Sequence, residues 1–129
     1  MYELGKINNV ITIPTSTEGK FFKYWFEFLR PYHKLTDREI DVIASFTKHR
    51  YNLSKVIQDT EILDRVTMGE DTKRKIREEC NITQAHFQVI MTKLKKSKVI
   101  EDGRINPKYI PRLENDSNNF QLLLSFDLQ

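Results

Sequence analysis

The side chains that could bind a metal ion or act as a nucleophile are three histidines and one cysteine. His33, His49 and His86 are separated by 16 and 37 residues, and with Cys80 they form no spacing typical of metal ligands. Cys80 follows Ile76 at the i+4 position of an expected helix, so we expect a thiol that packs in the core. The sequence has no phosphate-binding glycine motif and no Gly-x-Ser-x-Gly motif. We therefore expect a protein that is not an enzyme and needs no metal ion or cofactor.

Polar and basic residues between positions 83 and 104 could bind nucleic acid. Residues 73–98 contain eight Lys or Arg against two acids, so they carry +6, while the rest of the chain sums to −3. Short polar side chains at the start of a helix can reach base edges, and basic side chains at its end or on a wing can neutralise phosphates. The face expected to contact nucleic acid or a protein partner consists of Thr83, Gln84, His86, Gln88, Thr92, Lys93, Lys95, Lys96 and Arg104.

A solvated helix surface is the alternative interpretation of this face. The first turn of the helix contains no Arg or Lys, although Arg–guanine pairs are the commonest specific base contact. The lysines lie at the end of the helix, where they also complement the helix dipole.

These side chains depend on several helices for their position. Thr36 and Glu39 form a capping box, which predicts a helix to about Tyr51 with Ile40, Ile43, Ala44 and Phe46 in the core. A helix over about 55–66 is expected next, with Val56, Ile62, Leu63 and Val66 in the core.

A short helix capped by Asp71 or Thr72 is predicted to run to about Cys80. After a tight connection at 81–83, Thr83 caps a longer helix, and Asp102-Gly103 predicts a two-residue hairpin. The buried stripe of the longer helix consists of Phe87, Ile90, Met91 and Leu94. Helix, turn, helix and hairpin in this order are typical of a winged helix-turn-helix.

The two ends of the chain carry strand patterns. A strand is expected over 7–13, before Pro14, and an alternating closing strand over 120–128. Between these strands, the pattern of residues 21–30 predicts an aromatic helix, and we expect Pro31 to end it. The expected fold is α+β and mainly α: a winged helix-turn-helix-like core of about five helices, with a small antiparallel sheet formed by the N-terminal strand, the wing hairpin and the C-terminal strand.

The composition fits one domain over 1–129. Of 129 residues, 39% are hydrophobic and 30% charged, which allows one packed core. We divide the chain into the N-terminal strand and aromatic helix (1–35), the helical core and wing (36–105), and a loop with the closing strand (106–129). The longest apolar runs are too short to span a bilayer, and a single cysteine fits a reducing compartment. We also expect no secretory signal, because the sequence does not open with a basic segment followed by an apolar one.

Five segments carry a resemblance to a known family: 22–29 (FKYWFEFL), 35–40 (LTDREI), 75–82 (KIREECNI), 86–94 (HFQVIMTKL) and 105–111 (INPKYIP). They are distributed over residues 22–111, and none is an active-site motif. The chain resembles a small protein of crAss-like tailed phages of gut Bacteroidetes. The resemblance implies a bacteriophage virion protein, a part of the neck or ring between portal and tail.

Our leading hypothesis is a structural subunit of the head–tail connector ring, made in the host cytoplasm and assembled into the virion. Its expected partners are identical subunits, portal and tail proteins, with no membrane and no small-molecule substrate. Expected contacts between subunits are Phe21, Phe22, Tyr24, Trp25 and Phe26, unless these aromatic residues only complete the core. The terminal strands could extend a sheet across subunits.

Two further hypotheses stay open. The second is a transcriptional regulator that reads double-stranded DNA through residues 83–96. The third is an adaptor that binds only protein, with the basic face docking an acidic partner.

Overall fold

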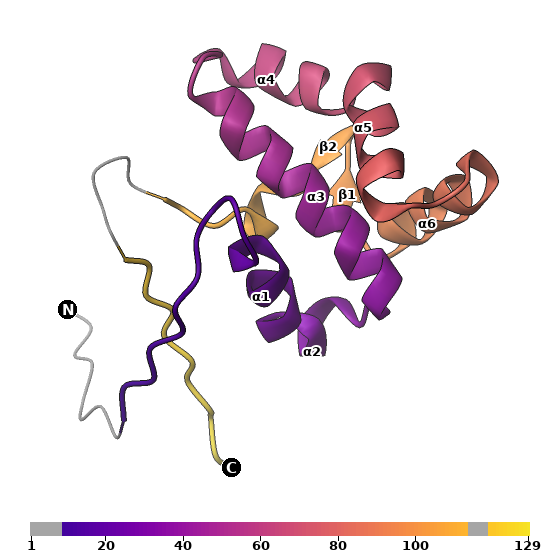
Figure 1. The fold of residues 1–129 in the computed structure, drawn as a ribbon. Coiled ribbons are helices and arrows are strands. Elements are labelled where there is room, and N and C mark those ends of the chain that lie inside the picture. The colour runs from indigo at the N-terminus through magenta and orange to yellow at the C-terminus, as the bar shows by residue number, and fades with distance from the viewer. Residues whose placement is uncertain (1–8, 114–118) are drawn as a thin grey trace.

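The computed structural model describes residues 9–113 and 119–129 of the chain. Within them, six helices accompany a small two-stranded antiparallel sheet, so the fold is mainly helical α+β (Figure 1). The elements are α1 (Phe21–Phe28), α2 (Arg30–His33), α3 (Asp37–Ser54), α4 (Thr60–Thr67), α5 (Glu70–Cys80), α6 (Gln84–Lys96), β1 (Ile100–Glu101), β2 (Arg104–Ile105) and a 3-10 turn (Pro107–Tyr109).

Helix α3 is the centre of the fold, and α1, α4, α5 and α6 all pack against it. The predicted capping box is confirmed: the Glu39 backbone N–H donates to the Thr36 hydroxyl at 3.4 Å, and the Thr36 N–H donates to the Glu39 carboxylate at 3.0 Å. The four predicted core residues of this helix are buried: Ile40, Ile43, Ala44 and Phe46. The helix continues three residues beyond the expected end at Tyr51.

Helix α1 buries two of its aromatic side chains in the same core. Phe22 and Phe26 are almost completely buried, and the Trp25 indole N–H donates to the Tyr109 carbonyl oxygen at 2.8 Å. Pro31 does not end this helix, contrary to the prediction. It lies in the first turn of α2, where its missing N–H is not needed for a helical hydrogen bond.

The prediction for 55–66 was wrong in its start and in its buried residues. Helix α4 begins only after Asp59, whose carboxylate accepts the backbone N–H of Ile62 at 3.0 Å. An aspartate at this position stabilises a helix start. The new helix therefore begins directly after Asp59, at the end of the connection at 55–59. Of the four expected core residues only Leu63 is buried, and Val56, Ile62 and Val66 are exposed.

The segment from α5 to the hairpin follows the sequence expectations closely. The N-cap of α5 is Gly69, so Asp71 and Thr72 lie inside the first turn instead of capping it. Thr83 caps α6 as predicted, accepting the His86 backbone N–H at 3.1 Å. The predicted buried stripe of α6 is confirmed for all of its residues: Phe87, Ile90, Met91 and Leu94.

The predicted hairpin at Asp102-Gly103 is also confirmed. Ile100 pairs with Ile105, and Glu101 pairs with Arg104. Asp102 and Gly103 both have positive φ, 57° and 72°, which is the geometry of the tight turn that suits a two-residue hairpin.

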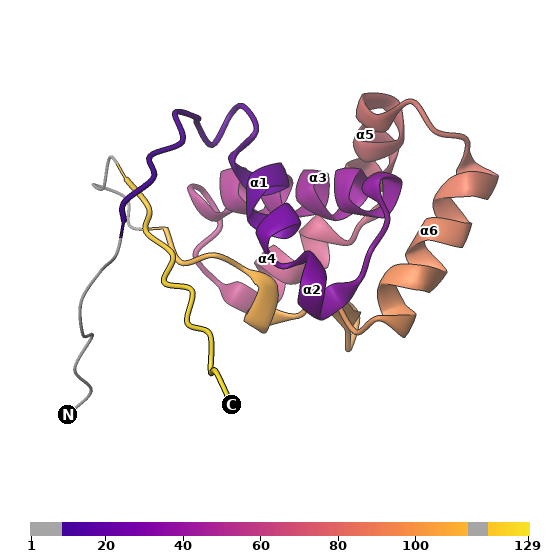
Figure 2. The ribbon, with the colours of Figure 1, turned by 90° about the horizontal axis from the view of Figure 1, so that it is seen from below.

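The prediction of a strand at each end of the chain was wrong for the described residues. Residues 9–13 and 119–129 are in no strand, and residues 7 and 8 of the expected first strand lie outside the described residues. The two segments run side by side away from the helices (Figures 1 and 2). A strand needs a partner for its backbone groups, and the sheet of the hairpin is only two residues long on each side. We name residues 9–20 the N-terminal arm and residues 119–129 the C-terminal arm.

Candidate interaction surfaces

Helix α6 lies at the edge of the molecule, with one side packed on the core and the other open (Figure 2). Eight of the nine predicted site residues share this open side, and all eight are exposed. We name them the α6 face: Thr83, Gln84, His86, Gln88, Thr92, Lys93, Lys95 and Lys96. The structure therefore brings these eight residues together on one helix and its N-cap.

The lysines at the end of α6 form no ion pair with the acidic residues that the structure describes. Lys93, Lys95, Lys96 and the adjacent Lys98 are exposed, and none of them takes part in the ion pairs found within residues 9–113 and 119–129. Their positive charges are therefore available to an anionic partner.

Sequence reasoning missed Val89 as a residue of this surface. It lies on α6 next to Gln88 and is 67% exposed. Val89 lies outside the buried stripe of Phe87, Ile90, Met91 and Leu94. The helical period therefore predicts that its side chain is exposed, and this signal could have identified it. An exposed apolar side chain among polar ones suits contact with a methyl group or an apolar partner.

Arg104 does not extend the α6 face. Its guanidinium lies 3.9 Å from the Asp64 carboxylate of α4, and the same carboxylate accepts a 2.8 Å hydrogen bond from Arg50. The other charged residues of the hairpin, Glu101 and Asp102, are both acidic. The hairpin therefore carries two acids beside one partly exposed arginine, which is a weaker basic surface than the one expected to neutralise phosphates.

Two of the aromatic residues expected at subunit contacts are excluded from that role. Phe22 and Phe26 are buried inside their own chain, because they form the apolar face that α1 packs against α3. The rings of Phe21 and Trp25 lie 5.2 and 5.5 Å from the ring of Phe120, edge to face. Tyr24, the remaining member of the predicted set, is partly exposed. Phe120 attaches the C-terminal arm to α1.

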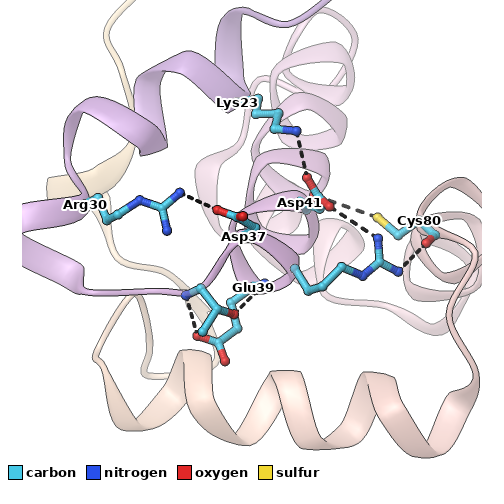
Figure 3. A network of polar contacts seen from close by, with 8 residues as sticks. Lys23, Arg30, Asp37, Glu39, Asp41 and Cys80 are labelled. Atoms are coloured by element: carbon cyan, nitrogen blue, oxygen red, sulfur yellow. Dashed lines mark hydrogen bonds and ion pairs between the residues drawn. The ribbon is translucent and has the colours of Figure 1, made fainter.

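A polar network joins α1, α3 and α5 (Figure 3). The Asp41 carboxylate lies 3.3 Å from both the Lys23 ammonium and the Arg38 guanidinium. Arg38 also donates to the Cys80 carbonyl oxygen at 2.6 Å. These contacts fix the end of α5, from which the turn to α6 departs.

Cys80 is a half-buried thiol in this network. Burial raises the pKa of the Cys80 thiol to about 11, and the nearby Asp41 carboxylate adds to the shift. Its Sγ lies 3.8 Å from the Asp41 carbonyl oxygen. Because a thiolate is the reactive form of cysteine, this position disfavours a nucleophile.

The three histidines lie in separate environments. His33 is buried beside Phe26, His86 is exposed on α6, and the His49 Nε2 lies 2.9 Å from the Glu79 carboxylate. Ser45 donates to the same carboxylate at 2.7 Å. This is not the order of a catalytic triad, in which the serine hydroxyl donates to the imidazole. Within the described ranges, no three His, Cys, Asp or Glu residues could hold a metal ion.

No protein-family model, curated protein or solved structure matches the chain. No helix within the described residues is long and apolar enough to cross a membrane. The two surfaces that remain as candidates for function are the α6 face and the two arms.

Proposed function

We propose that the chain is a non-enzymatic structural protein of a tailed-phage virion, a subunit of the head–tail connector ring. It acts by packing against identical copies, with portal and tail proteins above and below. The phage assignment rests on the sequence resemblance, and the packing role rests on the geometry of the two arms.

The observation that carries the packing role is the exposure of apolar side chains on the arms. In the C-terminal arm, Phe126 and Leu128 are 81% and 91% exposed. Further exposed apolar residues of both arms are Val10, Ile11, Ile13, Leu122, Leu123 and Leu124. An exposed apolar surface of this extent is typical of a surface that a partner covers.

Burial of these side chains at an interface would stabilise an assembly. Complete burial of one leucine or phenylalanine side chain contributes about 1.5–3 kcal/mol. An extended arm outside any sheet can also add to a neighbouring edge by main-chain hydrogen bonds. The arms therefore suit contacts between subunits better than contacts with solvent.

The test is the mass of the native protein. We expect light scattering and native mass spectrometry of the full chain to give a closed oligomer of one size, and electron microscopy to show a ring. A protein that stays monomeric at high concentration would contradict the proposal.

A second candidate function is a winged-helix regulator that binds double-stranded DNA. It is favoured by the order of α5, turn, α6 and hairpin, by the exposed Gln84 and Gln88, and by the unpaired lysines. We infer that α6 would then be the recognition helix. The acidic residues Glu101 and Asp102 of the hairpin weaken this second candidate, because carboxylates repel the phosphate backbone.

A further inference from the structure

The corner between α3 and α4 carries apolar side chains that the fold leaves uncovered. Val56, in the connection between the helices, is 78% exposed. Ile62 and Val66 lie one turn apart on α4 and are 47% and 40% exposed. We name these three residues the α4 corner. Its apolar character is unusual beside helices whose other outer positions are mostly polar.

The C-terminal arm of the same chain lies far from this corner. Phe120 fixes the arm to Phe21 and Trp25, and from there the arm runs away from α4 toward the opposite end of the molecule (Figure 1). The α4 corner and the C-terminal arm are therefore two uncovered apolar surfaces at opposite ends of the folded molecule.

We infer that the C-terminal arm of one copy docks on the α4 corner of the next copy. This inference rests on the proposed ring and specifies its contact. Because the two surfaces differ, the contact is head-to-tail. Repeated head-to-tail contacts form a ring when the rotation from one subunit to the next returns to the first subunit after a whole number of copies. An arm-to-arm contact would instead produce two-fold pairs.

The chemistry of the arm fits the corner. In an extended chain, alternate residues lie on one side, which places Leu124, Phe126 and Leu128 together. The nine residues after Phe120 can reach about 30 Å at ~3.3 Å per residue, enough to cross a neighbouring helix.

The charges at the two surfaces are also complementary. Asp127 is the sole charged residue of the C-terminal arm. It alternates with Phe126 and Leu128, so its carboxylate lies at the rim of the contact, where a long lysine side chain can reach it. At the corner, the Lys55 ammonium lies over the Tyr51 ring at 4.9 Å and has no acid partner within the described residues. The acids beside it are engaged: Asp59 caps α4, and Glu61 lies 3.6 Å from Arg65.

The test uses two variants of the full chain. The arm variant carries Leu124→Ser and Phe126→Ser, and the corner variant carries Val56→Ser and Ile62→Ser. All four side chains are exposed, so both variants should keep the circular dichroism of the parent. Each variant alone should lose the ring and become monomeric. An equal mixture should give a 1:1 dimer by native mass spectrometry, because one intact arm meets one intact corner.

Controls separate this contact from a general loss of solubility or fold. Tyr32→Ser removes an exposed aromatic side chain from α2 instead and should leave the ring unchanged. As a second measurement, Lys55→Glu should weaken the oligomer at low salt, and addition of Asp127→Lys should restore it.

The outcomes distinguish the docking contact from the proposed function. If both variants still form rings, the docking contact is wrong and the ring stands. If the corner variant keeps the ring and the arm variant loses it, the arm has another receptor. A parent chain that is monomeric contradicts both the ring and the contact.

Discussion

The imidazole of His33 is held in the core by Phe26, whose carbonyl oxygen lies 2.7 Å from Nε2. On its other side, Nδ1 accepts the backbone N–H of Leu35 at 3.0 Å. A ring nitrogen that accepts a hydrogen bond carries no proton. Nδ1 is therefore unprotonated, and Nε2 carries the proton and donates to the Phe26 carbonyl oxygen. Protonation of Nδ1 would break the bond to Leu35 and place a charge among apolar side chains.

We expect the stability of the fold to fall in mild acid because of His33. Burial lowers the pKa of His33 below its usual 6.5, with Arg30 acting in the same direction and the bond to Phe26 opposing it. The unfolded chain therefore binds more protons below pH 6.5, and stability is lost as the pH falls from 6.5 through the folded-state pKa. Denaturant unfolding at a series of pH values measures this loss, and His33→Gln should flatten the profile. An unchanged profile in the variant would assign the acid sensitivity to another group.

We expect Cys80 to react slowly with alkylating reagents at neutral pH. Its thiol has a pKa of about 11 in the folded chain, so very little thiolate is present. Mass spectrometry after iodoacetamide treatment measures the rate, and the denatured chain is the control that should react faster. Equal rates in the folded and denatured chains would contradict the raised pKa.

The ion pair between Arg50 and Asp64 should contribute more to stability than a surface pair. Both side chains are largely buried, and Nε and Oδ1 are 2.8 Å apart. Asp64→Ala leaves the Arg50 charge buried without its partner, and we expect a loss of about 3 kcal/mol in the free energy of unfolding.

The matched control for this pair is Asp71→Ala. Asp71 pairs with Arg74 at 3.2 Å on the open surface of α5, and we expect a change below about 1 kcal/mol. Urea denaturation of the three proteins measures both values. Similar losses from the two substitutions would show that burial does not strengthen the first pair.

The second candidate function makes its own prediction for the α6 face. If α6 reads DNA, Lys95→Ala should weaken binding to all sequences and reduce the salt dependence by about one phosphate contact. Gln88→Ala should instead weaken binding to the preferred sequence by about 1–3 kcal/mol. Fluorescence anisotropy with labelled duplexes at several salt concentrations measures both effects. The absence of salt-sensitive binding to any duplex would remove this function.

Local signals account for the parts of the fold that were predicted correctly. The capping residues Thr36 and Thr83 and the Asp102-Gly103 turn act within a few residues of themselves. The stripe from Phe87 to Leu94 follows the helical period. Each of these signals needs no knowledge of distant residues.

The incorrect predictions concern features that depend on distant or missing partners. The helical spacing of Ile62 and Val66 predicted a helix correctly. It did not predict which side of α4 is buried, and only the side that carries Leu63 packs in the core. The alternating pattern of 120–128 is a strand pattern without a sheet to join. The contact of Arg104 with Asp64 joins residues forty positions apart, and no spacing rule predicts it.

Trp25 is the only tryptophan of the sequence, and it lies beneath Phe120, where the C-terminal arm leaves the body. Any displacement of the arm therefore changes the surroundings of the indole. The intrinsic fluorescence of the chain is a built-in reporter of arm movement, so association of subunits can be followed in real time without an attached dye.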